Sequence, residues 1–212
     1  MCGRFTLTLN PDDIENFISK RFNTHIRGHG IPYPHYNIAP SMDVLSVLYD
    51  GKDYRAGYLT WGYRGFDKRD FSVINIRSET MFEKPMFKNS VHSKRCIVLA
   101  DGYYEWHDKV PYYIHREDKG IFAIASLWNI TKDEEGKTHN TVGLITQASK
   151  DIFESVHDRM PIILKDDEIE TWLQNGILED ASKQASEFEV YPVSKAVNKV
   201  INNEESLIMK TL

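Results

Sequence analysis

The sequence predicts an α+β fold with a large antiparallel component, in a single domain. Its 212 residues are enough for one domain with a substantial core. Short runs of β-branched and aromatic residues, separated by turn residues, recur along the chain and favour antiparallel strands. Helix patterns with capping signals stand between them, and no repeat, low-complexity segment or linker divides the chain. We therefore treat residues 1–212 as one folding unit.

The N-terminal part is predicted to contain a strand, a helix and a hairpin. Residues 4–9 alternate and are rich in β-formers, so the chain enters a strand almost at once. Asn10-Pro11-Asp12-Asp13 is typical of a helix start, because a cap, a proline and two acidic residues occupy the first turn. Residues 42–49 and 53–61 are predicted to form a hairpin about the Asp50-Gly51 turn.

Strands dominate the rest of the predicted chain. After a polar loop at 63–71, a strand begins at Ser72, and Asn75 and Arg77 are expected to project from one of its faces. Helices are predicted at 78–87 and 165–173. Further strands are predicted at 95–104, 112–115, 121–128, 141–146 and 188–193. The last residues are acidic and are expected to be peripheral.

Composition excludes several classes of protein. The chain is 41% hydrophobic and 27% charged, as in an ordinary globular protein. Its first residues lack a signal-peptide pattern, and no apolar run is long enough to span a bilayer. Cys2 and Cys96 are the only cysteines, and no Cys/His spacing fits zinc. We expect a cytoplasmic protein without membrane contact, disulfide, metal or other cofactor.

The net charge of −5 conceals an asymmetry. Residues 55–95 carry nine Lys/Arg against four Asp/Glu, whereas residues 165–212 carry five against ten. Within the basic part, the loop at 63–71 interleaves cations with Tyr63 and Phe66, the pattern by which proteins hold phosphates and stack unpaired bases. An exposed loop with solvated charges explains the same residues, so both interpretations stay open here.

The tetrapeptide Met1-Cys2-Gly3-Arg4 carries the most specific chemistry. Methionine aminopeptidases act when the second residue is small, so removal of Met1 would leave Cys2 with an α-amino group and a thiol on adjacent carbons. The amine titrates near ~7.7–8.0 and the thiol near ~8.5, so both are available as nucleophiles. This pair suits an aldehyde, because the amine forms an imine and the thiol closes a five-membered thiazolidine. The alternative is that Cys2 only begins a strand.

Glu105 and His157 are candidates for proton transfer. Glu105 stands among aromatic residues, where desolvation would raise the pKa of its carboxyl into a useful range. The alternative is a surface glutamate or one paired with an arginine. His157, beside Asp158 and Arg159, suits proton transfer, although a lone histidine is more often structural.

Taken together, these segments resemble the SOS response-associated peptidase family, the abasic-site processing proteins. The matching segments appear in the family's order: Met1-Cys2-Gly3-Arg4-Phe5, Tyr36-Asn37-Ile38-Ala39-Pro40, Trp61-Gly62, Asn75 with Arg77-Ser78-Glu79-Thr80, Arg95-Cys96, Asp101-Gly102-Tyr103-Tyr104-Glu105-Trp106 and His157-Asp158-Arg159-Met160-Pro161. The resemblance implies antiparallel strands forming a barrel-like core with peripheral helices. The motif-bearing part is 1–164, and an acidic, helical part follows at 165–212.

The resemblance also implies roles for individual residues. Cys2 is the nucleophile through its amine and its thiol, and Asn75 orients the N-terminus or the opened sugar. Glu105 shuttles protons, and His157 assists sugar opening or stabilises the 4′-side hydroxyl. The implied DNA-binding residues are the phosphate clamps Arg4, Arg77 and Arg159, with Phe66, Asn37 and Trp61. Two departures from the family pattern occur: Ile76 replaces the usual alanine, and the loop after Trp61-Gly62 lacks a Pro and a Trp, which leaves Phe66 as its stacking ring.

The expected function is covalent, reversible capture of abasic sites in single-stranded DNA. It would combine lyase-like crosslinking with self-processing peptidase activity, in a monomer that associates with the nucleoid on damaged DNA. Two alternatives stay open. One is a thiol or autoproteolytic peptidase that uses Cys2, and the other is a non-covalent single-stranded DNA-binding module.

Overall fold

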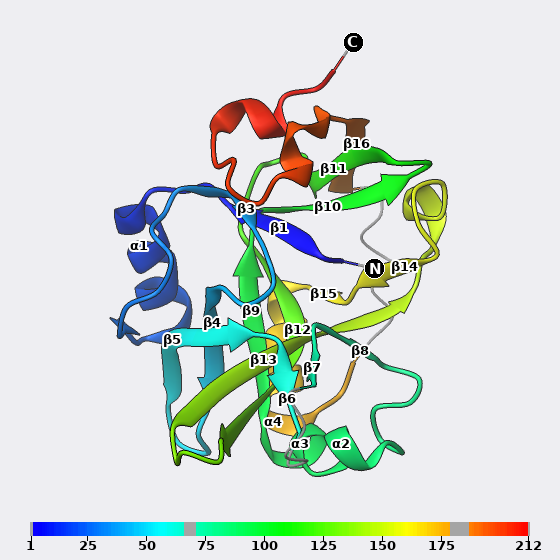
Figure 1. Ribbon diagram of the computed structural model, residues 1–212. Helices are drawn as coiled ribbons and strands as arrows, with labels where there is room; N and C mark the ends of the chain where they lie inside the picture. The colour runs from blue at the N-terminus through cyan, green and yellow to red at the C-terminus, as the bar shows by residue number, and fades with distance from the viewer. Residues whose placement is uncertain (1, 66–70, 179–186, 212) are drawn as a thin grey trace.

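The computed structural model describes residues 2–65, 71–178 and 187–211, and its centre is a closed barrel (Figure 1). The barrel strands are β4 (Asp43–Tyr49), β5 (Tyr54–Trp61), β9 (Arg95–Ala100), β12 (Phe122–Lys132) and β13 (Thr138–Ala148). They pair antiparallel in the order β13-β12-β9-β4-β5, and a parallel pairing of β13 with β5 closes the ring. The predicted α+β fold with a barrel-like antiparallel core is confirmed.

A second, antiparallel sheet lies at one end of the barrel, at the top of Figure 1. Its strands, in spatial order, are β16 (Phe188–Pro192), β11 (Val110–Arg116), β10 (Gly102–His107), β1 (Arg4–Leu7) and β3 (His35–Ile38). The strand predicted at 95–104 is therefore two strands, β9 in the barrel and β10 in this sheet. The break is at Asp101, which accepts hydrogen bonds from the hydroxyls of Thr6 (2.6 Å) and Thr8 (2.7 Å).

Short strands extend the barrel wall. β8 (Asn75–Arg77) runs parallel to β13, and β14 (Arg159–Pro161) runs antiparallel to it. Two segments that are far apart in the sequence, each with residues of the predicted site, therefore pair with the same strand. The other short strands are β2 (Ile26–Arg27), β6 (Tyr63–Arg64), β7 (Ser72–Val73) and β15 (Ile163–Leu164).

The two longest described helices form where their capping signals predict. α1 (Pro11–Phe22) begins after Asn10, whose side chain accepts a hydrogen bond from the amide of Asp13 at 2.9 Å. α4 (Asp166–Asn175) begins after Lys165, whose amide donates to Glu168 at 2.9 Å. Each buries one apolar face against the sheet strands. Among the described residues there are also the single 3₁₀ turns η1 (Asp151–Phe153), η3 (Lys195–Asn198) and η4 (Glu205–Ile208).

The helix predicted at 78–87 is wrong. Turns occupy residues 78–84, and only the short helices α2 (Pro85–Lys88) and α3 (Ser90–Ser93) follow. Lys84 is extended, with ψ 125°, because a proline disfavours the helical conformation of the residue before it. Pro85 therefore begins a helix instead of continuing one.

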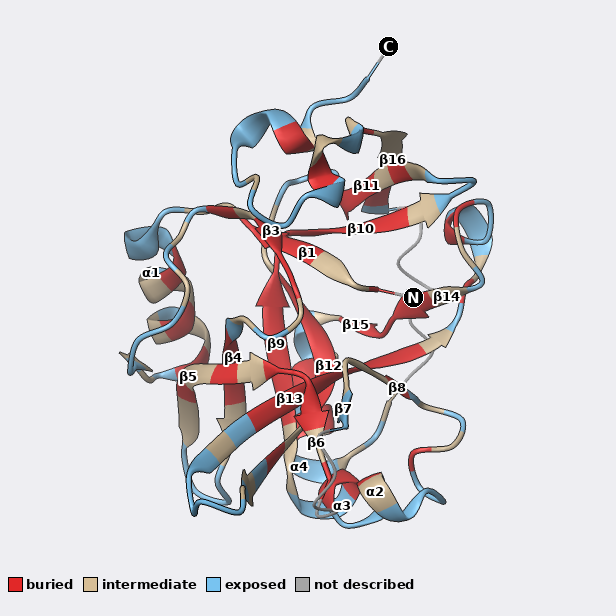
Figure 2. Ribbon diagram, viewed as in Figure 1, coloured by how far each residue is buried: buried red, intermediate tan, exposed pale blue. Residues whose placement is uncertain are grey.

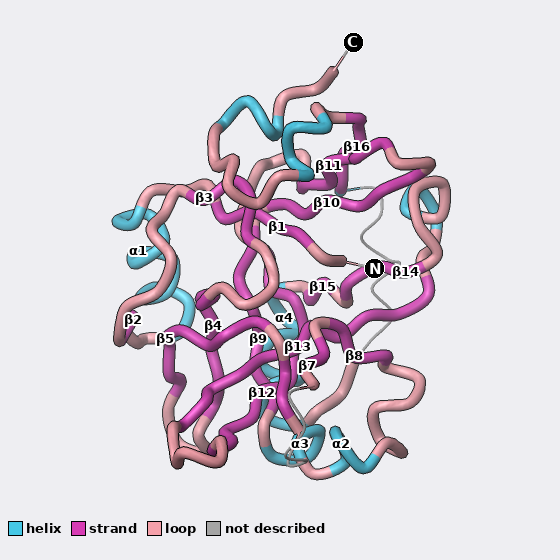
Figure 3. The backbone as a smooth tube through the Cα atoms, viewed as in Figure 1, coloured by secondary structure: helices cyan, strands magenta, loops and turns pink. Residues whose placement is uncertain are grey.

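The C-terminal residues are not peripheral. β16 completes the second sheet, and the side chains of Val197 and Leu207 have no exposed surface where they pack with Tyr104 and Tyr113. Figure 2 shows burial concentrated on the strands, and Figure 3 shows that strands make up most of the regular structure. Within the described residues, no helix is long and apolar enough to cross a membrane.

Candidate functional site around Cys2

Cys2 lies two residues before the start of β1, and β1 is held in place by a neighbouring strand on each side. β1 pairs with β10 on one side and β3 on the other, and Phe5 packs against Trp61 with ring centroids 5.1 Å apart. The Cys2 side chain has no exposed surface. Burial raises the pKa of its thiol, and the nearby negative charge of Glu105 raises it further. The thiol is therefore held rigidly and in its protonated form.

Asn75 contacts the backbone of Cys2. Its Nδ2 donates a hydrogen bond to the Cys2 carbonyl at 2.8 Å. β8 holds Asn75 beside Leu144 of β13, and the indole of Trp61 donates to the carbonyl of Ile74 at 3.0 Å. The Oδ1 atom of Asn75 is buried and has no hydrogen-bond partner among the described residues. The same side chain thus anchors Cys2 and keeps an acceptor available.

Glu105 lies on β10 with 2% of its surface exposed. Burial raises the pKa of its carboxyl to about 7, and the negative charge of Asp158 contributes in the same direction. A carboxyl with this pKa exchanges protons near neutral pH. Of the two interpretations of this residue, the structure supports the desolvated carboxyl.

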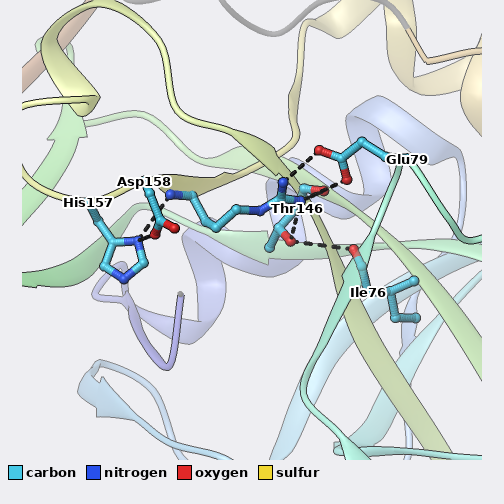
Figure 4. Close-up of polar contacts among 6 residues, drawn as sticks. Ile76, Glu79, Thr146, His157 and Asp158 are labelled. Atoms are coloured by element: carbon cyan, nitrogen blue, oxygen red, sulfur yellow. Dashed lines mark hydrogen bonds and ion pairs between the residues drawn. The ribbon is translucent and has the colours of Figure 1, made fainter.

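His157 lies in the loop between η1 and β14. Its Nδ1 is 2.7 Å from Oδ1 of Asp158, and the amide of Arg159 donates to the same nitrogen at 3.0 Å. Figure 4 shows the imidazole turned toward Asp158. Burial lowers the pKa of His157, which favours the neutral ring. Because Asp158 acts on both groups, the His157–Asp158 pair belongs to the neighbourhood of Glu105.

Arg159 is engaged in an ion pair. Its guanidinium donates to both carboxylate oxygens of Glu79, at 2.6 and 3.0 Å, and to the carbonyl of Thr146 at 2.7 Å. Figure 4 shows Glu79 and Thr146 grouped on the side away from His157. A phosphate at Arg159 would have to displace Glu79. In this structure the predicted phosphate-binding arginine instead links β14 to β13 and to the residues after β8 by hydrogen bonds.

Asn37 and Trp61 do not fit the predicted DNA-binding role, because neither has exposed surface. Asn37 donates to the carbonyls of Val197, Lys199 and Asn202 at 2.8 to 3.2 Å, and Trp61 packs in the core. Arg4 donates to Asn37 (2.6 Å) and to the Val197 carbonyl (2.7 Å). These residues fix the C-terminal segment and the strand that carries Cys2.

Arg77 is the predicted clamp that is available to DNA. It ends β8, two residues after Asn75, its side chain is exposed, and it forms no ion pair within the described ranges. Phe66, the predicted stacking ring, lies outside the described residues.

Two members of this neighbourhood escaped assignment from the sequence. Glu79 is 80 positions from Arg159, and Thr146 is brought to Arg159 only by the pairing of β13 with β14. No spacing signal links residues so far apart. In the part of the chain that the structure describes, no group of three or more His, Cys, Asp or Glu side chains is placed to hold a metal ion.

Comparisons with known proteins identify the family of this chain. A family model described as SOS response associated peptidase (SRAP) matches residues 1–200. The chain is 37% identical over 225 residues to the abasic site processing protein YoqW of Bacillus subtilis (strain 168), covering 98% of this chain and 99% of the relative. It is 32% identical over 255 residues to the abasic site processing protein HMCES of Xenopus tropicalis, covering 96% of this chain and 76% of the relative.

Solved structures share the fold of this chain. A crystal structure of a protein from Bacteroides thetaiotaomicron superimposes with a TM-score of 0.82 at 21% identity, over 100% of both chains. The family model, in contrast, matches the amino-acid sequence and covers residues 1–200. The first residues, the Asn75 strand, the Glu105 strand and the His157 loop all lie inside it. This chain belongs to the SOS response associated peptidase (SRAP) family.

Proposed function

We propose that this protein captures abasic sites in single-stranded DNA covalently, through Cys2, once Met1 has been removed. The relatives are named abasic site processing proteins, which supports the lesion as substrate. The observation that carries the proposal is the arrangement of Cys2. Its backbone is anchored by Asn75, and its thiol is buried beside a carboxyl whose pKa is raised to about 7.

The chemistry balances without a cofactor. The sugar of an abasic site opens to an aldehyde, and the Cys2 amine adds to the aldehyde carbon. The C–O bond then breaks, the oxygen leaves as water, and the thiol adds to the same carbon to close a thiazolidine. The amine and the thiol each give up one proton, and both protons leave in the water. Because no imine remains, β-elimination and strand breakage are blocked.

Each site residue has a step in this sequence. Burial keeps the thiol protonated, so the amine attacks first and the thiol adds only after a base has taken its proton. Glu105 serves as that base, and as the acid that protonates the departing oxygen, because its pKa lies near neutral pH. Asn75 Oδ1 accepts from the Cys2 amine or a sugar hydroxyl, His157 assists sugar opening, and Arg77 holds a flanking phosphate.

Removal of Met1 by the protein itself is the form of peptidase activity that this site suits. The family description supports a peptidase, and a self-processing step needs Cys2 to attack only one bond. Cleavage of added peptides needs the same thiolate, which the raised pKa of Cys2 disfavours, and it lacks the advantage of a bond tethered beside the sulfur. Lyase-like crosslinking and self-processing are therefore both assigned to Cys2.

The test compares Cys2→Ser and Cys2→Ala with the parent on an abasic single-stranded oligonucleotide. The parent should give a heat-stable, SDS-resistant adduct without reductant. Both variants lack the thiol but keep an N-terminal amine, so they should give an adduct only when borohydride traps the imine. Cys96→Ala is the matched control, because Cys96 is the other buried cysteine, and it should crosslink as the parent does.

Intact mass spectrometry completes the experiment. It should show loss of Met1 in the parent and in Cys96→Ala, and retention of Met1 in Cys2→Ala, because self-processing needs the Cys2 thiol. The parent's adduct should be lighter than protein plus DNA by one water. An equal yield of heat-stable adduct from Cys2→Ala would remove the aminothiol mechanism. A peptidase that acts in trans would cleave peptides without DNA, and a non-covalent binder would ignore the lesion.

A further inference from the structure

Tyr103 lies beside the reacting groups, although nothing in the proposed mechanism uses it. It stands two residues before Glu105 on β10, so both side chains project from the same face of that strand. β1 pairs with β10 in a register that sets Phe5 opposite Tyr103 and Arg4 opposite Tyr104. The residues that connect Cys2 to β1 therefore run beside the part of β10 that contains Glu105. Cys2 and Tyr103 both have no exposed surface and belong to the same core cluster.

The hydroxyl of Tyr103 is buried without a hydrogen-bond partner among the described residues. Leaving such a group unpaired is energetically unfavourable, and a phenylalanine would fill the same space without that cost. The next residue shows the usual arrangement, since the Tyr104 hydroxyl donates to the carbonyl of Tyr36 at 2.8 Å. Asn75 Oδ1 is a second buried, unpaired polar atom of the same site. Two unsatisfied atoms around one cysteine indicate groups that await a polar ligand.

We propose that Tyr103 is a further catalytic residue, whose hydroxyl donates a hydrogen bond to the aldehyde oxygen of the opened abasic sugar while Cys2 attacks the carbon. This inference rests on the proposed function and adds a residue to it. As the C–N bond forms, the electron pair of the C=O bond moves to the oxygen. A fixed donor at that oxygen stabilises the developing negative charge.

Tyr103 and Glu105 would then divide the work between them. Burial raises the pKa of Tyr103, and the negative charges of Cys2 and Glu105 raise it further, so the phenol stays protonated and acts only as a donor. Glu105 exchanges its proton near neutral pH and supplies the one that converts the hydroxyl into water. Tyr103 keeps its own proton throughout the reaction, so the proton balance of the mechanism does not change.

The experiment measures the single-turnover rate of adduct formation for Tyr103→Phe on an abasic single-stranded oligonucleotide. The rate should fall by about 100-fold, the usual effect of removing one donor to a developing oxyanion. Binding to an oligonucleotide with a tetrahydrofuran analogue, which has no aldehyde, should not change. Thermal stability should not fall, because the hydroxyl has no partner to lose. Tyr104→Phe is the matched control and should lower stability without slowing the adduct.

The outcomes separate this inference from the function on which it rests. If the parent forms adduct and Tyr103→Phe forms it at the parent's rate, Tyr103 has no catalytic role and the proposed function stands. If the parent forms no adduct, the proposed function fails instead. A parallel loss of analogue binding in Tyr103→Phe would also overturn the inference, because it would make Tyr103 a binding residue. Should Tyr103→Phe not fold, Tyr103→Leu lacks the same hydroxyl and carries the same expectation.

Discussion

Glu105 shows how much of the chemistry is set at the scale of one residue. Its carboxyl is surrounded by core side chains on β10, and its proton affinity follows from that burial. The same burial that makes it useful for proton transfer makes its ionised form costly. Its contribution to stability must therefore depend on pH.

The free energy of unfolding should fall as pH rises from about 4.5 to 7, in part because of Glu105. Its carboxyl has a pKa of 4.5 in the unfolded chain and about 7 in the folded one. In this range the folded protein binds a proton that the unfolded chain has released. The contribution of the protonated Glu105 carboxyl to the free energy of unfolding is thus fully present below pH 4.5 and is lost as pH rises through 7. The loss amounts to roughly 3 kcal/mol.

Urea unfolding at several pH values checks this expectation. Glu105→Gln should flatten the pH dependence, because the amide does not titrate. The difference between the parent and variant curves isolates this one group from all others. Parallel curves would mean that Glu105 titrates normally in the folded protein.

Glu105→Gln should also slow reversal of the adduct more than it weakens DNA binding. Ring opening needs a proton on the departing sulfur, and the amide cannot supply it. Transfer of the crosslink to an excess of a second abasic oligonucleotide measures reversal. Glu135→Gln, on the exposed turn between β12 and β13, is the matched control. Equal reversal rates in parent and Glu105→Gln would take Glu105 out of this step.

At the scale of elements, β13 organises the site. β8 and β14 pair with this one strand, so Asn75, Arg77 and Arg159 are brought together from distant parts of the chain. The two arginines nevertheless differ. Arg159 is occupied by Glu79, whereas Arg77 is exposed at the end of its strand. Arg159 therefore has a structural role, whereas the guanidinium of Arg77 is accessible from outside the protein.

Arg77→Ala should weaken binding to single-stranded DNA of any sequence. Losing one phosphate contact should also reduce the slope of log K against log salt concentration by about 0.7. Titration at several salt concentrations, with an undamaged oligonucleotide, measures both effects. Arg55→Ala is the control, since Arg55 is partly exposed but pairs with Asp50 in the β4–β5 turn. An unchanged salt slope for Arg77→Ala would show that Arg77 makes no phosphate contact.

At the scale of the whole molecule, the C-terminal segment locks the second sheet onto the N-terminus. Asn37 binds three carbonyls of residues 197–202, and Arg4 contacts both Asn37 and Val197. The strand that carries Cys2 is therefore fixed by residues almost 200 positions away. Rigidity at the site depends on closure of the whole chain.

Asn37→Ala should lower the free energy of unfolding by about 2–4 kcal/mol, because several buried hydrogen bonds are lost together. The folded fraction should still bind DNA as the parent does, since Asn37 has no exposed surface. Urea unfolding and DNA titration on the same preparations separate the two effects. Asn140→Ala, at an exposed position of β13, is the control. Normal stability with lost DNA affinity would restore Asn37 to the DNA interface.

Features that depend on near neighbours in the chain were predictable from the sequence. The hairpin about Asp50-Gly51 and the helix that begins at Pro11 follow from turn and capping residues that act within a few positions. The chemistry available at Cys2 and the aromatic setting of Glu105 are also local. The exception among local patterns is the helix predicted at 78–87, where the effect of Pro85 on Lys84 outweighed the pattern.

Which polar residues are exposed and which are paired depends on long-range contacts, so it could not be predicted from the sequence. Asn37 and Trp61 are buried inside the protein, and Arg159 forms an ion pair with Glu79. These contacts arise because β13 pairs with β5, β8 and β14, which brings together segments that are far apart in the sequence. The unpaired hydroxyl of Tyr103 is likewise invisible in the sequence. A residue type fixes what a side chain can do, whereas burial and long-range pairing fix whether it remains available to do it.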